Sequence, residues 1–475
     1  MRIHITTIGL IALATPGLAT SSITDAVQEA GSAATTPAAD PAAAKAAEKA
    51  ARLAAKLEEK RQRELRAKYG DGPYPDQIAA YADARPEQLR PLYRTLYTGG
   101  ERNAVLNFQR LGLAAFEAGL FKDAAWAFDQ ALARIEAIYA DNPQAATARS
   151  VFHNEANKDY KGEPYERAMA YYYRGLLYLR DGDYSNARIA FREAERQDTL
   201  SDSEEFQSDF AAMNYLQGWS LRCQGRHDAA KEYFDLASKA EKGLTAPAPG
   251  DDVLFLAELG NGPVKLRDGA QAQKLLFGAG APYPETLATV THGAGGVPTT
   301  IALVPASNVT FQATTRGGRA IDGLMNGKAN WKEGTDTLGN ALMTQGLGSN
   351  DPSGGYMALA GLAFSMFSKT MKTSADIRAW DGLPDRIMVG TTRATAPDWT
   401  YSVAYAGEKG PVTMQGVTMR ATPRGCGIVW MRSRPAAYSE AIVGEDEGVA
   451  AGQNRKKPVQ AKNRLFRTTL EGQSL

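Results

Sequence analysis

GLAAFEAGLFKDAAWAFDQA, residues 112–131, is the first of three stretches that share one spacing of glycine, alanine and phenylalanine. The second is GLLYLRDGDYSNARIAFREA (175–194), and the third is GWSLRCQGRHDAAKEYFDLA (218–237). In each stretch a glycine is followed seven residues later by a second glycine, and then by alanine, phenylalanine and alanine. The three copies align without gaps, and such recurrence is typical of a helical-repeat domain.

This spacing predicts one pair of antiparallel helices per copy. The first glycine and the first alanine leave room for two helices to cross closely, and the second glycine suits a left-handed helix end. The phenylalanine is expected to face the next hairpin, so that neighbouring copies cover each other. The residues with this packing role are Gly112, Ala124, Phe128, Gly175, Ala187, Phe191, Gly218, Ala230 and Phe234. We therefore predict a tetratricopeptide-like repeat domain over residues 74–244. Its hairpins are unevenly spaced, because Ala124, Ala187 and Ala230 are 63 and 43 residues apart.

The first residues indicate export. Arg2 precedes an apolar run at residues 5–14, and Gly17 with Ala19 gives the small-x-small pattern of a signal-peptide cleavage site. We expect a signal peptide at residues 1–19, a periplasmic location, and no transmembrane segment after its removal. Residues 20–40 predict a disordered linker rich in Ala, Ser and Thr, and the charged, Ala-rich residues 41–69 predict a solvated spacer helix.

β-type patterns begin after residue 250. Strands are predicted at residues 253–259, 264–266, 301–304, 309–314, 386–392, 400–405, 412–419 and 427–432, and helices at 332–347 and 356–372. Together they predict a mixed α/β domain at residues 251–435 that ends in a small β-sandwich-like unit. Residues 436–475 are polar and predict a disordered tail. The expected fold class is therefore α+β with several domains.

Charge and cysteine content limit the classes of partner. Lysine and arginine number 54 against 53 acidic residues, so no electrostatic attraction to nucleic acid is expected.

The two cysteines, Cys223 and Cys426, can be read as a disulfide that joins the two domains or as two separate buried thiols, and we expect separate thiols. No metal site or cofactor is expected, since His153, His227 and His292 lie at no ligand spacing.

Motifs for enzyme chemistry are incomplete. His292-Gly293-Ala294-Gly295-Gly296 resembles an oxyanion-hole loop, but the matching nucleophile turn is only approximated around Ser353 and no histidine follows it. We therefore expect no enzymatic activity. A serine hydrolase that uses Ser353 remains a remote alternative.

Two segments resemble an exported tetratricopeptide family of bacterial envelope proteins to which no role has been assigned. The first is DYKGEPYER (159–167), continuing through YYYRG (171–175) to YLRDGDY (178–184), and the second is ADIRAWDGLPDRI (375–387). The segment GNGPVK (260–265) fits the opening β-hairpin of the same family. The resemblance implies a non-enzymatic envelope protein, mostly found as a lipoprotein, and hints at cell-wall assembly because some members are encoded beside an activator of peptidoglycan synthesis. No cysteine directly follows the apolar run at residues 5–14, so we do not expect the lipid anchor of that family here.

These features favour a periplasmic scaffold or adaptor that binds an envelope protein through a helical-repeat groove, with peripheral association to the outer membrane or cell wall. Aromatic and arginine side chains dominate the energetics of protein interfaces. The candidate partner-binding residues are Tyr160, Lys161, Glu163, Tyr165, Arg167, Tyr171, Arg174 and Tyr178. The alternative is a protein that binds cell-wall glycan or peptidoglycan through Trp399, Tyr401 and Trp430. In the second signature, we expect Arg378 to hold the corner between helix and sheet by pairing with Asp376 or Asp381.

Overall fold

The computed structural model describes residues 41–69, 75–98, 103–139, 160–198, 209–268, 274–293, 298–315, 377–394, 399–412, 417–421 and 425–438. The chain divides into two compact units, Met1–Glu64 and Leu65–Leu475. The helical hairpins and the sheets thus belong to a single compact unit. The predicted signal peptide (1–19), the linker (20–40), the helices 332–347 and 356–372, and most of the tail lie outside the described residues.

Helix α1 (Pro41–Tyr69) occupies the range in which the sequence predicts a helix. Charged pairs one turn apart support it, as between Glu48 and Arg52 at 2.7 Å and between Glu59 and Arg63 at 2.7 Å. The side chains of Leu53 and Leu57, which form its thin apolar stripe, are exposed. No described helix of the chain is long and apolar enough to cross a membrane.

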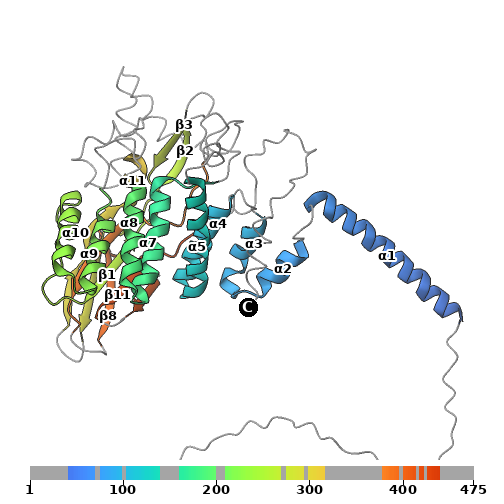
Figure 1. The fold of residues 1–475 in the computed structure, drawn as a ribbon, viewed down its shortest axis with the longest axis horizontal. Coiled ribbons are helices and arrows are strands. Elements are labelled where there is room, and N and C mark those ends of the chain that lie inside the picture. Colours follow the sequence, from blue (N-terminus) through green and yellow to red (C-terminus); the bar gives the residue numbers. More distant parts are fainter. Residues whose placement is uncertain are drawn as a thin grey trace, which may run out of the picture. The chain divides into compact units, whose positions relative to one another are not determined.

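Three helical hairpins form one layer of the second unit (Figure 1). They are α4 (Ala104–Glu117) with α5 (Phe121–Tyr139), α7 (Pro164–Arg180) with α8 (Tyr184–Asp198), and α9 (Ala211–Cys223) with α10 (His227–Ala240). The shorter elements α2 (Pro75–Asp83), η1 (Glu87–Leu89) and α3 (Arg90–Thr98) precede them. An α+β fold with a helical N-terminal region is therefore confirmed.

The three hairpins turn in the same way. The second glycine of each copy has a positive φ: 73° at Gly119, 75° at Gly182 and 75° at Gly225. In each turn the glycine N–H donates to the carbonyl three residues earlier, and the next N–H donates to the carbonyl five residues earlier. This hydrogen-bond pair is the Schellman motif, which needs a left-handed residue at this position. The predicted role of these glycines as helix ends is confirmed.

Each first glycine lies against the phenylalanine of its own hairpin. A Cβ atom added at Gly112 would come within 2.9 Å of the Phe128 ring, and one added at Gly218 within 2.9 Å of Phe234. The phenylalanine, which the sequence predicts to face the next hairpin, thus also packs within its own hairpin, because its ring fills the space left by the missing side chain of the partner helix. Phe128 does also reach the next hairpin, where its ring stacks on Tyr173 with centroids 5.7 Å apart.

The β-strands form three groups. A five-stranded sheet has the order β10-β11-β1-β7-β6, a four-stranded sheet has the order β5-β4-β8-β9, and β2 pairs with β3 alone. The five-stranded sheet contains β10 (Val417–Ala421), β11 (Gly427–Arg432), β1 (Val253–Leu259), β7 (Arg386–Thr392) and β6 (Val304–Asn308). The others are β5 (Thr299–Ala302), β4 (Leu287–Gly293), β8 (Thr400–Gly407), β9 (Gly410–Val412), β2 (Val264–Asp268) and β3 (Lys274–Gly278).

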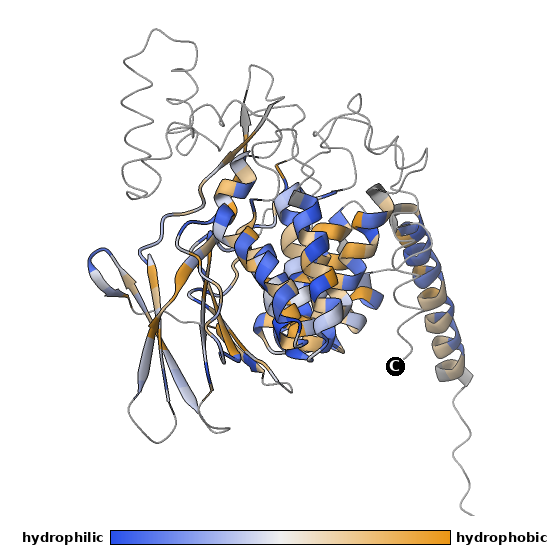
Figure 2. Cartoon of the chain, turned by 60° about the vertical axis from the view of Figure 1, so that its left-hand side comes forward, coloured by the Kyte–Doolittle hydropathy of each residue, from blue (hydrophilic) through white to orange (hydrophobic). Residues whose placement is uncertain are grey.

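The five-stranded sheet is the middle of three layers, with the helices on one face and the four-stranded sheet on the other (Figure 2). Its central strand β1 is buried along its whole length, and successive side chains alternate between the two faces. Leu254 and Leu256 join the core shared with the helices, whereas Phe255 and Ala257 join the core shared with the other sheet. Burial on both faces explains the nearly continuous apolar sequence of β1.

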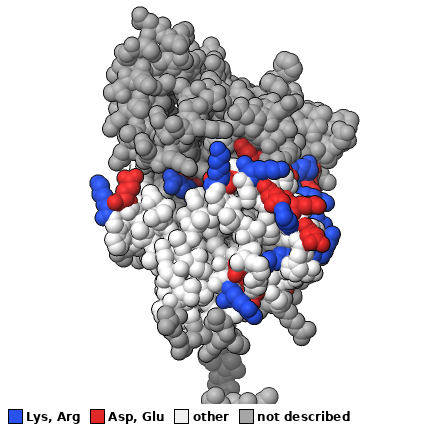
Figure 3. All heavy atoms as spheres, turned by 90° about the vertical axis from the view of Figure 1, so that its left-hand side faces the viewer, with Lys and Arg blue, Asp and Glu red and all other residues white. Residues whose placement is uncertain are grey.

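The outward face of the four-stranded sheet carries no charged residue among its described strands. Thr291 pairs with Thr300 on one side and Ser402 on the other, and Thr289 pairs likewise with Ala302 and Ala404. Figure 3 views the side that is on the left in Figure 1, where the charged side chains lie mainly around the margin of an uncharged central area.

Four local predictions are wrong. The segment predicted as a strand at 309–314 is helix α11 (Val309–Thr315), whose first turn is capped by the Asn308 side chain accepting from Phe311 N at 2.7 Å. The predicted strands 301–304 and 412–419 are each divided between two strands of different sheets, β5 and β6 in the first case and β9 and β10 in the second. The predicted tail also begins too early, because Ala436 N donates to Glu117 at 2.9 Å and the Tyr438 hydroxyl donates to Arg110 O at 3.1 Å.

We expect Gly175→Ala to lower the free energy of unfolding by about 1–3 kcal/mol, because the new methyl group overlaps the Phe191 ring. Chemical unfolding of the purified protein measures this change. Adding Phe191→Leu to the variant makes space for the methyl group. The two substitutions together should therefore cost less than the sum of their separate costs. Strict additivity would contradict the contact.

Candidate functional site: the junction of helices and sheet

Half of the predicted partner-binding residues are buried. The exposed fractions are 2% for Tyr160, 1% for Tyr165, 3% for Arg167 and 5% for Tyr171. The remaining residues, Lys161, Glu163, Arg174 and Tyr178, are partly exposed. In this conformation, then, only the second group has surface with which another protein can make contact.

The buried residues among these predicted partner-binding residues make contacts within the chain. Arg167 donates to the Gln197 side chain and to Gly162 O, both at 2.7 Å. The Tyr171 hydroxyl donates to Glu136 at 2.9 Å, and the Tyr165 ring meets Phe277 of β3 edge to face. These contacts hold α7 to α5, α8 and β3.

We call the contact between the helices and the five-stranded sheet the junction. At its centre lies the Glu258 carboxylate of β1, which is fully buried and faces the helices. It accepts hydrogen bonds from the Tyr173 hydroxyl of α7 and the Trp430 indole of β11, each at 2.8 Å. Its other neighbour is the Arg432 guanidinium, with Nε 3.6 Å from the carboxylate. Arg432 also donates to Glu117 of α4 at 2.7 Å. Glu258 on the sheet thus contacts two residues of the neighbouring strand β11 and one tyrosine of helix α7.

The acid–base chemistry of this cluster follows from its burial. Burial raises the pKa of the Glu258 carboxyl, and the charge of Arg432 and the hydrogen bonds from Trp430 and Tyr173 oppose that rise. Burial likewise raises the pKa of the Glu117 carboxyl, again opposed by Arg432. Arg432 is paired with both carboxylates, as in a structural ion-pair network, while its Nε atom is buried without a hydrogen-bond partner among the described residues.

A second buried pair joins Glu166 of α7 to Lys265 of β2, with a distance of 2.7 Å and almost no exposure of either side chain. Glu166 also accepts from Glu163 N at 2.7 Å, which caps the start of α7. Its other oxygen accepts from Trp380 N at 2.8 Å. The first turn of α7 therefore binds both the β2 strand and the segment before β7.

Residues 377–387, the described part of the second segment that resembles the exported family, lie in the same junction. Arg378 donates to the Asn103 side chain at 2.8 Å, and Asp381 pairs with the buried Arg110 of α4 at 2.5 Å. The predicted partner Asp376 lies outside the described residues. The Arg378 and Asp381 side chains thus contact α4 and the residue that precedes it.

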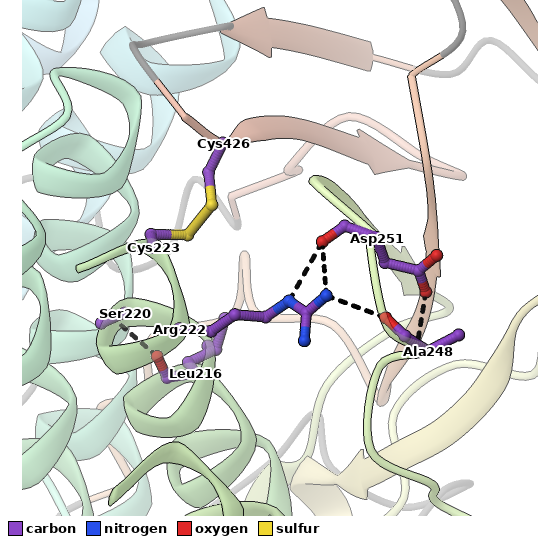
Figure 4. The surroundings of a disulfide bond; sticks show 7 residues. All are labelled: Leu216, Ser220, Arg222, Cys223, Ala248, Asp251 and Cys426. Carbon is purple, nitrogen blue, oxygen red and sulfur yellow. Dashed lines mark hydrogen bonds between the residues drawn. A yellow bond between two sulfur atoms is a disulfide. The ribbon is translucent and has the colours of Figure 1, made fainter. Parts of the chain in front are cut away.

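A disulfide between Cys223 and Cys426 closes the far end of the junction (Figure 4). It joins the last residue of α9 to the residue before β11, so the expectation of two separate thiols is wrong. Beside it, Arg222 donates to Asp251 O at 2.8 Å and to Ala248 O at 2.8 Å. The linker between the helices and β1 is thereby fixed to the end of α9.

The residues proposed for glycan stacking do not form an exposed platform. Trp430 is buried in the core shared with the helices, and Trp399 in the core between the sheets, where Arg420 lies 4.0 Å from its ring centroid. Tyr401 is partly exposed and packs on Trp399. Two of the three aromatic rings therefore have no face available to a sugar.

The residues considered for hydrolysis are not brought together in the part that the structure describes. Ser353 and residues 294–297 lie outside it, and His292 is buried beside Phe255 with a 3.1 Å hydrogen bond to Thr392. Burial lowers the pKa of His292. Across the described ranges, no group of three or more His, Cys, Asp or Glu residues could hold a metal ion.

Sequence reasoning missed the charged centre of the junction. Glu258 is the one charged residue in the apolar strand VLFLAEL, and Arg432 ends the apolar strand GIVWMR. An isolated charge in a strand expected to be buried requires a partner. That rule would have indicated Glu258 and Arg432 as a candidate pair. No comparable signal pointed to Lys265.

Comparison with known proteins found no protein-family model, no curated protein and no solved structure that matches this chain.

We expect the double variant Cys223→Ser/Cys426→Ser to fold with a markedly lower free energy of unfolding. The disulfide bridges a sequence separation of 203 residues. The chain-entropy model for a loop of that size gives a loss of about 5 kcal/mol. Denaturant unfolding measures it, and wild type under reducing conditions should match the variant. A change below about 1 kcal/mol would contradict a stabilising role.

We expect Glu258→Gln to change how stability depends on pH. Because burial raises the folded pKa of Glu258 above its ordinary value of 4.5, the folded state holds this proton more tightly than the unfolded state. The carboxyl's contribution to stability is then greatest at low pH and is lost as the pH rises above about 4.5. Denaturant unfolding at a series of pH values should show wild type losing stability relative to the variant as pH rises. The opposite trend would show that Arg432, not burial, dominates.

Proposed function

We propose that this protein is a non-enzymatic scaffold of the bacterial cell envelope, whose tetratricopeptide-type hairpins bind a partner protein. The observation that carries the proposal is the threefold repetition of one hairpin, with the same left-handed turn and the same glycine–phenylalanine contact. Repeats of this kind build extended surfaces for protein binding. We also propose that the two packed sheets form a β-sandwich-like unit and that the chain belongs to the exported family that its signatures resemble.

The first helix of each hairpin packs against the five-stranded sheet. Phe116 of α4 packs edge to face on Trp430, Tyr173 of α7 bonds to Glu258, and Ala212 N of α9 donates to Ser307 at 2.9 Å. A partner that binds the folded protein would therefore meet the second helices and the partly exposed ends of the hairpins.

The partly exposed signature residues supply one such surface. Arg174 donates to Asp129 of α5 at 2.7 Å and lies 3.9 Å from the centroid of the Tyr178 ring. This cluster, Asp129–Arg174–Tyr178, joins two hairpins and holds an arginine and a tyrosine in fixed positions. Preorganised side chains of these two types are the ones that most often carry binding energy.

The disulfide is consistent with the proposed export to the periplasm. A disulfide persists in an oxidising compartment and is rare in the bacterial cytosol. Helix α1 has 29 residues and so a length of about 43 Å at the usual helical rise. We propose that it is a spacer ahead of the folded unit, as its charged and exposed surface suggests.

We expect Arg174→Ala/Tyr178→Ala to weaken capture of the envelope partner by roughly tenfold or more, because it removes two interface side chains. Cross-linking in intact envelopes, followed by quantitative mass spectrometry, measures the amount captured. Lys231→Ala/Asp235→Ala provides a matched control, since it removes an exposed charged pair on α10. Equal capture by wild type and both variants would reject this surface.

A further inference from the structure

We propose that the junction contains a peptide-binding site in which residues 377–383 are the resident occupant, and that a partner peptide with an aromatic residue followed by an acidic one competes for it. The proposal deepens the proposed scaffold function, on which it rests, by naming the chemistry of the partner. The segment Ile377–Leu383 belongs to no helix or strand and precedes β7.

The main chain of this segment is held by side chains rather than by strand pairing. Trp380 N donates to Glu166 at 2.8 Å, and Lys265 donates to Arg378 O at 2.8 Å. Arg432 donates to Gly382 O. Charged side chains from α7, β2 and β11 therefore bind backbone groups of a segment that includes a turn at Asp381 and Gly382, as a protein does when it recognises a peptide.

Two side chains of the segment enter separate parts of the site. The Trp380 indole is buried between rings, with its centroid 5.7 Å from Tyr173 and 6.2 Å from Phe128. The Asp381 carboxylate pairs with Arg110, whose side chain is fully buried. The site therefore selects an aromatic ring and, next to it, a negative charge.

The resident segment satisfies this site incompletely. Among the described residues, Arg110 Nε and Nη1 and the Trp380 Nε1 atom are buried without a hydrogen-bond partner. A buried guanidinium donor left unmet costs free energy, and a carboxylate that binds Arg in the two-point geometry would meet it. A peptide carboxylate that accepts from Arg110 Nε or Nη1 would therefore form a hydrogen bond that is missing when Asp381 occupies the site.

A peptide added to wild type has to compete with a tethered occupant, which lowers its apparent affinity. The test uses the full-length variant Trp380→Ala/Asp381→Ala and a labelled peptide of sequence IRAWDGLP, which repeats residues 377–384. Fluorescence anisotropy should show the variant binding this peptide roughly tenfold or more tightly than wild type does. A peptide with alanine at both substituted positions is the matched control and should bind neither protein.

Equal binding of the two peptides by a variant that unfolds cooperatively would overturn the proposal. If the variant does not fold alone, the matched peptide should raise its thermal transition or restore it, and the control peptide should not. If the matched and control peptides have the same effect on the thermal transition, the proposal is also overturned. Because this measurement needs no envelope partner, its outcome is independent of the cross-linking result that tests the scaffold function.

Discussion

The Glu258 carboxylate lies in the apolar layer between the helices and the five-stranded sheet, and the organisation of the second unit depends on keeping that charge satisfied. A buried carboxylate without partners is strongly destabilising, so Tyr173, Trp430 and Arg432 must all be in place when the layers close. These partners come from α7 and β11, which lie far apart in the sequence. The requirement therefore couples the helical hairpins to the sheet more specifically than apolar packing does.

The same coupling changes how the helical surface is interpreted. A repeat domain with an open groove would present tyrosines and arginines to a partner, but here Tyr165, Arg167 and Tyr171 are buried by the chain's own residues. The disulfide and the Glu166–Lys265 pair fix the two ends of this contact. The protein is consequently better described as one layered body than as a repeat domain carrying a separate sheet domain.

The local features of the fold could be predicted because each rests on a few neighbouring residues. The left-handed glycines, helix α1, and the strands β1, β7 and β11 follow from spacing and apolar pattern alone. The segment at 309–314 was misread because its β-branched residues suit a strand, while the Asn308 cap and its surroundings favour a helix. The candidate site could not be predicted, since Arg110, Glu166, Lys265 and Trp380 meet only after distant segments pack together.

Native-state hydrogen exchange tests most directly whether the helices and the sheet form one cooperative body. The account predicts that the slowest amides of α4 and α7 and those of β1 and β11 exchange with the same free energy of opening, because Glu258 and Arg432 cannot be separated from Tyr173 and Glu117 without global unfolding. The denaturant dependence of these amides should also coincide. If the β1 and β11 amides opened at a clearly lower free energy while α4 and α7 stayed protected, the helices would be an independent domain and the central claim would be contradicted.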